Sequence, residues 1–291
     1  MWQAYEVPNS VEEALAILAR CDGEAQLIAG GTDLIIELQD GRHSVRCLVD
    51  VTRIPGLDGI EEQDGLIVLG ANVTFRQIKE SPLLQDRARV LAEAAGTVGA
   101  LQIQTVATLA GNVVSALPAA DGSVALRALD AEVEVAGPQG RAWRPVSELF
   151  LAPGKSAVDP HREMITAVRF AALGPRQGSA WERLGRRRAL VLPILNCGAS
   201  LALDDQDRIA WARLSLGPVA PVPFRACQAE AALAGEPAGE EAFARAGEIA
   251  AGECQPRSSL LRASREYRLE VLPVLVRRCL GRAAAQARAR A

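Results

Sequence analysis

The sequence lacks the residues that several enzyme classes require. It has two histidines, His43 and His161, and no GxSxG motif, which argues against a Ser-His-Asp hydrolase. Its six cysteines include no CxxC pair, and neither histidine lies in a ligand-like cluster. A zinc or iron–sulfur site held by this chain alone is therefore not expected, and the cysteines are interpreted as reduced, mostly buried thiols. We expect no metal ligand and no catalytic side chain, so any enzymatic reactivity would come from a cofactor.

Long apolar runs and an excess of one charge are also missing. No uninterrupted apolar stretch reaches the roughly 18 residues that a membrane helix needs. Residues 1–14 have neither the basic nor the apolar segment of a signal peptide. The formal net charge is −3 with both signs mixed, which disfavours nucleic acid as the main partner. The sequence predicts a cytoplasmic protein without a membrane span.

What is present predicts a globular chain with a sizeable core. Apolar residues make up 49% of the 291 residues, enough for about two domains. Ser10 and Glu13 form a capping box that opens a helix, and Asp22 with Gly23 ends it. Strand and helix patterns then alternate, with strands expected at 25–29, 45–51, 66–71, 131–136 and 163–170 and helices at 33–40, 84–98 and 123–129.

The pattern breaks at residues 172–178, which indicates a domain boundary. The sequence therefore predicts domains at 1–174 and 175–291, the first divided into subdomains 1–54 and 55–174. The second domain is expected to hold strands 179–184, 197–203 and 208–216 and helices 224–234, 239–251 and 259–284.

A turn at residues 28–34 is the first candidate binding segment. Gly30 and Gly31 have no Cβ, so the backbone can approach a ligand closely. Successive N–H groups in such a turn, aided by the following helix N-terminus and by the Thr32 hydroxyl, can bind an anion. The segment is neither GxGxxG nor GxxxxGK[ST], so the Rossmann and P-loop interpretations do not apply. Taken alone, a purely structural turn is favoured over a phosphate site.

The second candidate segment is residues 107–121. Thr108, Gly111, Asn112 and Ser115 supply small polar groups on a flexible backbone. Asp121 could cap the following helix or accept a hydrogen bond from a ligand hydroxyl, with capping favoured for the segment alone.

Together the two segments resemble, in order and spacing, the two flavin-binding motifs of the FAD-binding medium subunit of molybdenum hydroxylases. That family includes xanthine dehydrogenase and carbon monoxide dehydrogenase. Residues 29–34 match its first motif, approximately AGGTDL, and residues 108–121 match its second, approximately TLGGNIANASPAAD. The similarity continues at 153–155, 220–230 and 255–278.

The resemblance implies an α+β fold, in which a two-subdomain FAD-binding domain of the vanillyl-alcohol-oxidase/PCMH type precedes a small C-terminal domain. That second domain would contain a three-stranded antiparallel sheet and helices. The implied function is that of an oxidoreductase subunit that passes electrons through FAD to an external acceptor. The molybdenum cofactor would lie in a large partner subunit and two [2Fe-2S] clusters in a small one, arranged as a dimer of heterotrimers.

The resemblance also implies residue roles. The first motif would wrap the FAD pyrophosphate, and the second would bind the same phosphates and adjoining parts. Asp121 would accept from FAD hydroxyls or adenine-side donors, and residues 190–194 would approach the isoalloxazine ring. The expected FAD-binding residues are Ile28, Ala29, Gly30, Gly31, Thr32, Asp33, Leu34, Thr108, Gly111, Asn112, Ser115, Asp121 and Leu192.

Three positions depart from the family pattern. Gln104 replaces a common arginine, Leu117 a small residue, and Ala110 a glycine, which is tolerable only if its φ is negative. These departures motivate one alternative, a structural subunit that has kept the fold but lost FAD. A second alternative is a stand-alone flavin oxidase, although the chain lacks a dedicated large substrate domain and its first motif lacks the histidine for covalent flavin attachment. The substrate is not encoded here, because the molybdenum subunit would select it.

Overall fold

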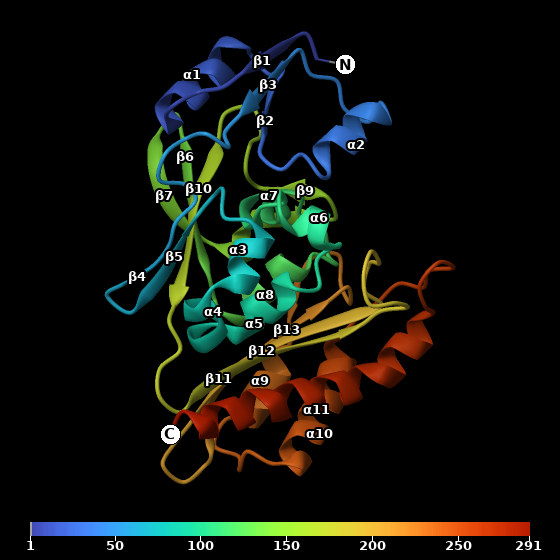
Figure 1. The fold of residues 1–291 in the computed structure, drawn as a ribbon. Helices are drawn as coiled ribbons and strands as arrows, with labels where there is room; N and C mark the ends of the chain where they lie inside the picture. The colour runs from blue at the N-terminus through green and yellow to red at the C-terminus, as the bar shows by residue number, and fades with distance from the viewer. Residues whose placement is uncertain (1) are drawn as a thin grey trace.

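The first 54 residues fold around a three-stranded parallel sheet with the strand order β1-β3-β2. The computed structural model describes residues 2–291, and this sheet lies at the N-terminal end of the molecule (Figure 1). The Ser10 side chain accepts from the Glu13 N–H at 3.1 Å, whereas the Glu13 carboxylate accepts from Asn9, so half of the predicted capping box forms. The elements are β1 (Ala4–Glu6), α1 (Val11–Arg20), β2 (Ala25–Ile28), α2 (Leu34–Gln39) and β3 (Cys47–Asp50).

A five-stranded antiparallel sheet, ordered β4-β5-β10-β6-β7, forms the middle of the molecule. Helices pack between it and the C-terminal sheet (Figure 1). The predicted helix 84–98 is two shorter helices, α4 and α5. The elements are β4 (Ile60–Gln63), β5 (Leu66–Gly70), α3 (Phe75–Glu80), α4 (Pro82–Arg87), α5 (Arg89–Ala95), α6 (Leu101–Gln104), α7 (Leu109–Val114), α8 (Asp121–Ala128), β6 (Glu132–Gly137), β7 (Gly140–Pro145), η1 (Val146–Leu149), β8 (Phe150–Ala152), β9 (Lys155–Ser156) and β10 (Met164–Ala171).

The C-terminal sheet has four antiparallel strands, so the expectation of three was wrong by one. The missed strand, β14, covers the first two residues of the helix predicted at 224–234. Its Phe224 pairs with Leu216 of β13. Arg225 holds this segment extended, because its guanidinium binds Glu230 and Asp130. The elements are β11 (Gln177–Leu184), β12 (Leu195–Leu203), β13 (Ile209–Gly217), β14 (Phe224–Arg225), α9 (Cys227–Leu233), α10 (Glu240–Glu253) and α11 (Arg265–Ala289).

The last helix begins six residues later than the sequence predicted. The Ser264 hydroxyl accepts from the Tyr267 N–H at 3.2 Å and caps α11, which starts at Arg265. Leu260 and Leu261, which fit the apolar helical spacing, lie before this cap and are fully and largely exposed. The start of α11 is therefore set by the Ser264 cap and not by the apolar spacing of the sequence.

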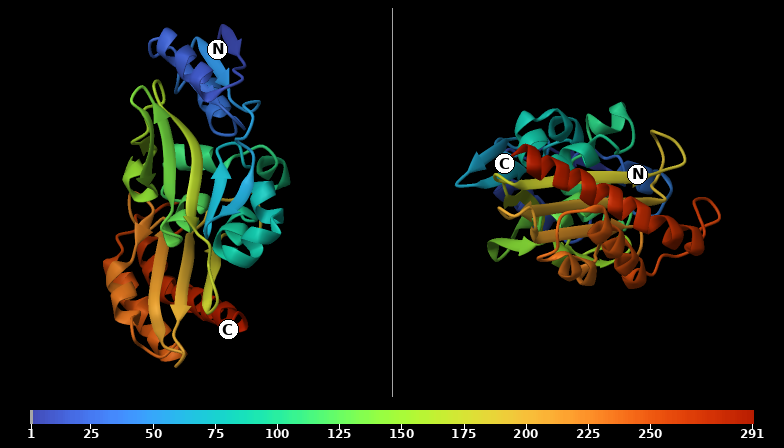
Figure 2. Two further views of the ribbon diagram at one scale, coloured as in Figure 1. Left: turned by 90° about the vertical axis from the view of Figure 1, so that its left-hand side faces the viewer. Right: turned by 90° about the horizontal axis from the view of Figure 1, so that it is seen from below.

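The three units stack along the long axis of the molecule (Figure 2). Buried polar contacts join the middle unit to the C-terminal sheet. The Ser200 hydroxyl donates to the Ala128 carbonyl at 2.6 Å, and the Val90 N–H donates to the Ser179 hydroxyl at 3.0 Å. Trp181 of β11 is itself part of the apolar core of the middle unit. No helix within residues 2–291 has the length and apolarity to cross a membrane.

Candidate cofactor site

The two candidate segments lie against each other, although about 80 residues separate them in the chain. A Cβ placed on Gly30 would lie 2.1 Å from the Val106 carbonyl oxygen, so glycine is required by backbone-to-backbone contact between the segments. The Ser115 hydroxyl donates to the Asp33 carboxylate at 2.9 Å. Asp33 precedes α2 but makes no capping hydrogen bond with its side chain. Its role in the structure is therefore to connect the two segments.

The turn after β2 presents a run of free backbone donors. The N–H groups of residues 30–34 have no hydrogen-bond acceptor among residues 2–291. Gly31 adopts φ +65°, a conformation that glycine tolerates best. Unpaired N–H groups that follow one another in a turn form a concave site for an anion. The turn can therefore hold a phosphate group.

The second segment uses most of its polar groups internally. Thr108 caps α7 by accepting from the Gly111 N–H at 3.1 Å. The Asn112 side-chain oxygen accepts from the Ser123 N–H at 3.0 Å and so fastens α7 to the start of α8. Ala110 lies in α7 and has no positive φ, so the condition for replacing glycine there is met. Thr108 and Asn112 thus shape the segment, and the exposed Gly111 leaves its surface open.

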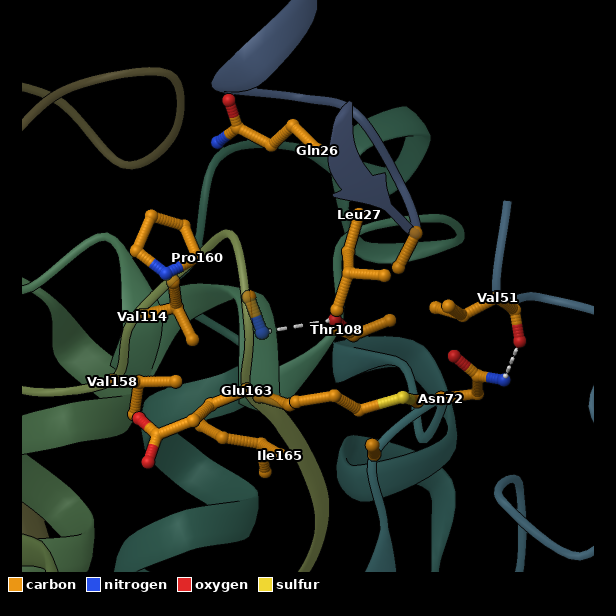
Figure 3. Close-up of a pocket in the computed structure, with 15 residues that line it drawn as sticks. Gln26, Leu27, Val51, Asn72, Thr108, Val114, Val158, Pro160, Glu163 and Ile165 are labelled. Carbon is orange, nitrogen blue, oxygen red and sulfur yellow. Dashed lines mark hydrogen bonds between the residues drawn. The ribbon is translucent and has the colours of Figure 1, made fainter. Parts of the chain in front are cut away.

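A cavity of about 120 Å³ opens beside the turn (Figure 3). It lies between β2, α7 and the start of β10, and Ala29, Thr108 and Gly111 of the two segments contribute to its wall. Most of the lining is apolar. The lining residues are Gln26, Leu27, Ala29, Val51, Ala71, Asn72, Thr108, Ala110, Gly111, Val114, Val158, Pro160, Glu163, Met164 and Ile165. Sequence reasoning missed Asn72, Met164 and Ile165, because no local motif marks residues that meet only in the folded chain.

Asp121 is engaged at the boundary between the middle unit and the C-terminal sheet. Its buried carboxylate accepts from Arg183 Nε at 3.3 Å and from Asn196 Nδ2 at 2.8 Å. Burial raises the pKa of Asp121 to about 6, against the lowering effect of the Arg183 charge. Its side chain makes no capping hydrogen bond to α8, whose N-cap is Ala120. The carboxylate therefore links α8 to β11 and β12.

The predicted residue Leu192 lies on the loop between β11 and β12, and Gln104, one of the departures from the family pattern, lies on α6. Leu192 is half exposed and does not line the cavity. The neighbouring Leu190 donates its N–H to the Gly99 carbonyl at 2.9 Å, which ties this loop to the start of α6. Gln104 is buried and its amide donates to the carbonyls of Gly96 and Val98, so it stabilises the same turn without a charge.

Comparison with known proteins assigns the family. The model of the FAD binding domain in molybdopterin dehydrogenase matches residues 2–172, and that of the CO dehydrogenase flavoprotein C-terminal domain matches residues 181–283. The chain belongs to the FAD-binding subunits of the molybdenum hydroxylase family. A xanthine dehydrogenase FAD-binding subunit from Escherichia coli O157:H7 is 30% identical over 98% of this chain and 97% of its own length. A carbon monoxide dehydrogenase structure from Hydrogenophaga pseudoflava matches with a TM-score of 0.92 and 30% identity, covering 98% of each chain.

The family assignment confirms the α+β fold, the FAD cofactor and the place of this FAD-binding subunit among oxidoreductases. A nicotinate dehydrogenase FAD-subunit from Eubacterium barkeri is also 30% identical, over 79% of both chains. The individual FAD contacts and the boundary at residue 174 stay predictions.

The residues of the FAD-binding subunit fit the cofactor. The free N–H groups of residues 30–34 suit a pyrophosphate. Sites for whole cofactors measure about 300–1,000 Å³, so the cavity of about 120 Å³ can take one ring system of FAD and not the entire molecule. Among residues 2–291 no cluster of three or more His, Cys, Asp or Glu side chains could hold a metal ion.

Proposed function

We propose that this subunit transfers electrons from the [2Fe-2S] clusters of a partner subunit, through FAD, to an external acceptor within a molybdenum hydroxylase complex. The observation that carries the proposal is the row of unpaired N–H groups at residues 30–34, which borders an apolar cavity. FAD supplies the redox chemistry when bound, while the protein binds and orients it. We expect no general acid or base from this chain, because FAD would carry the reaction.

Within the site, the backbone of residues 30–34 binds the pyrophosphate and the Thr32 hydroxyl adds a donor. The cavity next to Ala29 and Gly111 takes the adenine end, because its volume suits a bicyclic base and its wall is apolar. The loop that carries the half-exposed Leu192 would hold the flavin end, and the flavin would there exchange electrons with a donor and an acceptor. Ser115 and Asp33 act by fixing the two segments, and Asp121 acts by fixing α8.

Relatives support a place in a larger complex. Proteins similar to this chain include the medium chain of carbon monoxide dehydrogenase from Hydrogenophaga pseudoflava and the medium subunit of nicotine 6-hydroxylase from Paenarthrobacter nicotinovorans. We propose that a large subunit with the molybdenum cofactor and a small [2Fe-2S] subunit bind this chain as a dimer of heterotrimers in the cytoplasm. Residues 1–174 would carry FAD, with residues 175–291 as the second domain.

A charge placed in the turn tests the site. Thr32→Glu puts a carboxylate beside the proposed pyrophosphate, and FAD affinity should fall at least tenfold, equivalent to about 1.4 kcal/mol. Gln39→Glu adds the same charge at the far, exposed end of α2 and should leave affinity unchanged. Flavin-free protein is titrated with FAD by fluorescence quenching. Equal affinities in both variants would refute the site.

Two rival functions predict different results in the same preparations. A structural subunit that has lost FAD would take up none, so a protein without a flavin absorption band after titration would favour it. A stand-alone flavin oxidase would turn over a substrate as an isolated chain. Electron-transfer function instead requires that substrate oxidation appears only with the partner subunits present.

A further inference from the structure

Two loops at one end of the C-terminal sheet expose large apolar side chains. Leu260 is fully exposed and Leu261 is 81% exposed, on the loop that joins α10 to α11. Leu190 and Leu192 are more than half exposed, on the loop between β11 and β12. Both loops project from the same end of this sheet (Figure 1 and Figure 2). Large apolar side chains gathered on an exposed surface mark a site of interaction with another molecule.

Both loops carry positive charge and no negative charge. Residues 185–193 contain three arginines and residues 255–264 contain two, whereas neither segment contains Asp or Glu. The whole chain has a net charge of −3, so this positive charge is local. Among residues 2–291, none of the five arginines forms an ion pair. They are Arg186, Arg187, Arg188, Arg257 and Arg262. A partner for this end should therefore present carboxylates.

A buried arginine adds to the positive charge of the loop before α11. Arg268 is 2% exposed, and its Nη1 donates to the Pro218 carbonyl oxygen at 2.9 Å. Burial and the neighbouring charges of Arg262 and Arg257 lower its pKa, although an arginine stays charged in a protein. Within residues 2–291 no carboxylate pairs with Arg268. The chain thus leaves this charge without an opposite one, and an acidic partner at the surface would compensate it through space.

Hydrogen bonds hold both loops in shape. The Ser259 N–H donates to the Ala263 carbonyl oxygen at 3.0 Å, which closes the tip that carries the two exposed leucines. In the other loop, the Leu190 N–H donates to the Gly99 carbonyl, and the Leu190 carbonyl accepts from Arg187 Nε at 3.0 Å. A surface that is already formed loses less conformational entropy when a partner binds. The leucines are therefore presented in a fixed arrangement.

The composition of the two loops discriminates between possible occupants. A second copy of this chain, related by a two-fold axis, would bring the same arginines against each other, which is repulsive. Single-stranded nucleic acid binds to basic grooves with aromatic side chains, and neither loop contains an aromatic residue. A protein whose carboxylates surround an apolar patch matches both the arginines and the leucines.

We propose that residues 185–193 and 255–264 form the docking surface for the [2Fe-2S] partner subunit, which meets the arginines with carboxylates and the leucines with an apolar patch. This inference rests on the proposed function, in which the loop that carries Leu192 holds the flavin end of FAD. Electron transfer requires the donor to lie close to the flavin, so the partner that covers this loop is the electron donor. Leu260 and Leu261 anchor that subunit, and the arginines orient it.

Substitutions at the most exposed positions test the surface. Leu260→Asp puts a charge into the apolar contact, and Arg257→Glu reverses a charge that faces carboxylates. Each should raise the Kd for the [2Fe-2S] subunit at least tenfold. That subunit is purified from the native complex, and its binding to the FAD-loaded chain is measured by isothermal titration calorimetry.

Two matched controls make the same changes outside the docking surface. Leu151→Asp alters an exposed leucine on β8, and Arg278→Glu alters an exposed arginine on α11. Both should leave the Kd unchanged. The FAD content of all four variants should equal that of the wild-type chain, since none of the changed residues belongs to the proposed FAD site.

The rate of flavin reduction distinguishes docking from a direct role in the redox step. The [2Fe-2S] subunit is reduced, freed of excess reductant and mixed with the FAD-loaded chain, and loss of the flavin absorption band is followed by stopped flow. Its two reduced clusters give one electron each to one FAD. Leu260→Asp should slow this step at least tenfold at low concentrations of the partner subunit. At saturating concentrations the rate should return to that of the wild type, because the loop acts in binding alone.

The docking surface and the proposed function fail on different results. An unchanged Kd in both Leu260→Asp and Arg257→Glu would overturn the docking surface and leave the FAD site standing. Vesicles of phosphatidylserine and phosphatidylcholine in equal parts test a membrane as occupant. Vesicle binding that Leu260→Asp abolishes, without binding of the [2Fe-2S] subunit, would overturn the choice of partner. A wild-type chain that takes up no FAD would overturn the proposed function and, with it, this inference.

Discussion

At the scale of single residues, Asp121 predicts a measurable dependence of stability on pH. Burial raises its pKa from 3.8 to about 6, so between about pH 4 and pH 6 the folded protein binds a proton that the unfolded chain releases. The contribution of this group to stability is therefore largest at low pH and is lost as pH rises through that window. The full loss is about 3 kcal/mol at 1.36 kcal/mol for each pKa unit.

Asp121→Asn isolates this contribution, because the amide keeps an acceptor for Arg183 and Asn196 but cannot titrate. The free energy of unfolding of the flavin-free protein is measured by urea denaturation at several pH values. Relative to the variant, the wild-type protein should become less stable by up to about 3 kcal/mol from pH 4 to pH 7. Parallel pH profiles would show that Asp121 does not titrate in this range.

Gly30 predicts a second residue-scale effect, one that is independent of FAD. An alanine Cβ there would lie 2.1 Å from the Val106 carbonyl oxygen, so Gly30→Ala must force the two segments apart. Overpacking of this kind costs about 1–3 kcal/mol, and the melting temperature of the flavin-free protein should fall accordingly. Gly252→Ala in α10 is the control, because its Cβ meets open space and alanine favours a helix. An unchanged melting temperature for Gly30→Ala would contradict the contact.

At the scale of elements, the hydrogen bond from Ser115 to Asp33 should couple the turn before α2 to the end of α7. A double-mutant cycle with Ser115→Ala and Asp33→Ala measures this coupling in the flavin-free protein. An interaction energy of about 1 kcal/mol is expected for one hydrogen bond to a carboxylate at a partly exposed site. Each single variant should also weaken FAD binding, because the donors at residues 30–34 lose their fixed position. Strictly additive effects would mean that the segments do not support each other.

The same elements show which features the sequence could predict. The turn at 28–34 was predictable, because adjacent glycines after an apolar run reflect local backbone chemistry. The place of Asn72 on the cavity wall was not predictable, since Val51 and the start of β10 meet it only in the folded chain. Asp121 could be singled out by its motif, but its partners Arg183 and Asn196 lie 62 and 75 residues further along the chain. The two-residue strand β14 was missed for the same reason, as the distant Asp130 helps to hold Arg225.

At the scale of the whole molecule, buried contacts join the middle unit to the C-terminal sheet, although each has its own apolar core. Trp181 of β11 is 4% exposed and packs in the apolar cluster of the middle unit. The hydrogen bonds from Val90 to Ser179 and from Ser200 to Ala128 are buried between the same two parts. Opening this boundary would expose apolar surface and break buried hydrogen bonds, so separating the middle unit from the C-terminal sheet would cost free energy.

The two parts should therefore unfold together even though two family models divide the chain between them. Calorimetry of the flavin-free protein is expected to show one transition with equal calorimetric and van't Hoff enthalpies. Trp181→Ala should lower the stability of this single transition by about 3–5 kcal/mol, the usual cost of truncating a buried aromatic side chain. The partly exposed Trp211 on β13 is the control, and its alanine variant should cost less. Two separate transitions in the wild-type protein would show that the domains are energetically independent and that the buried boundary does not couple them.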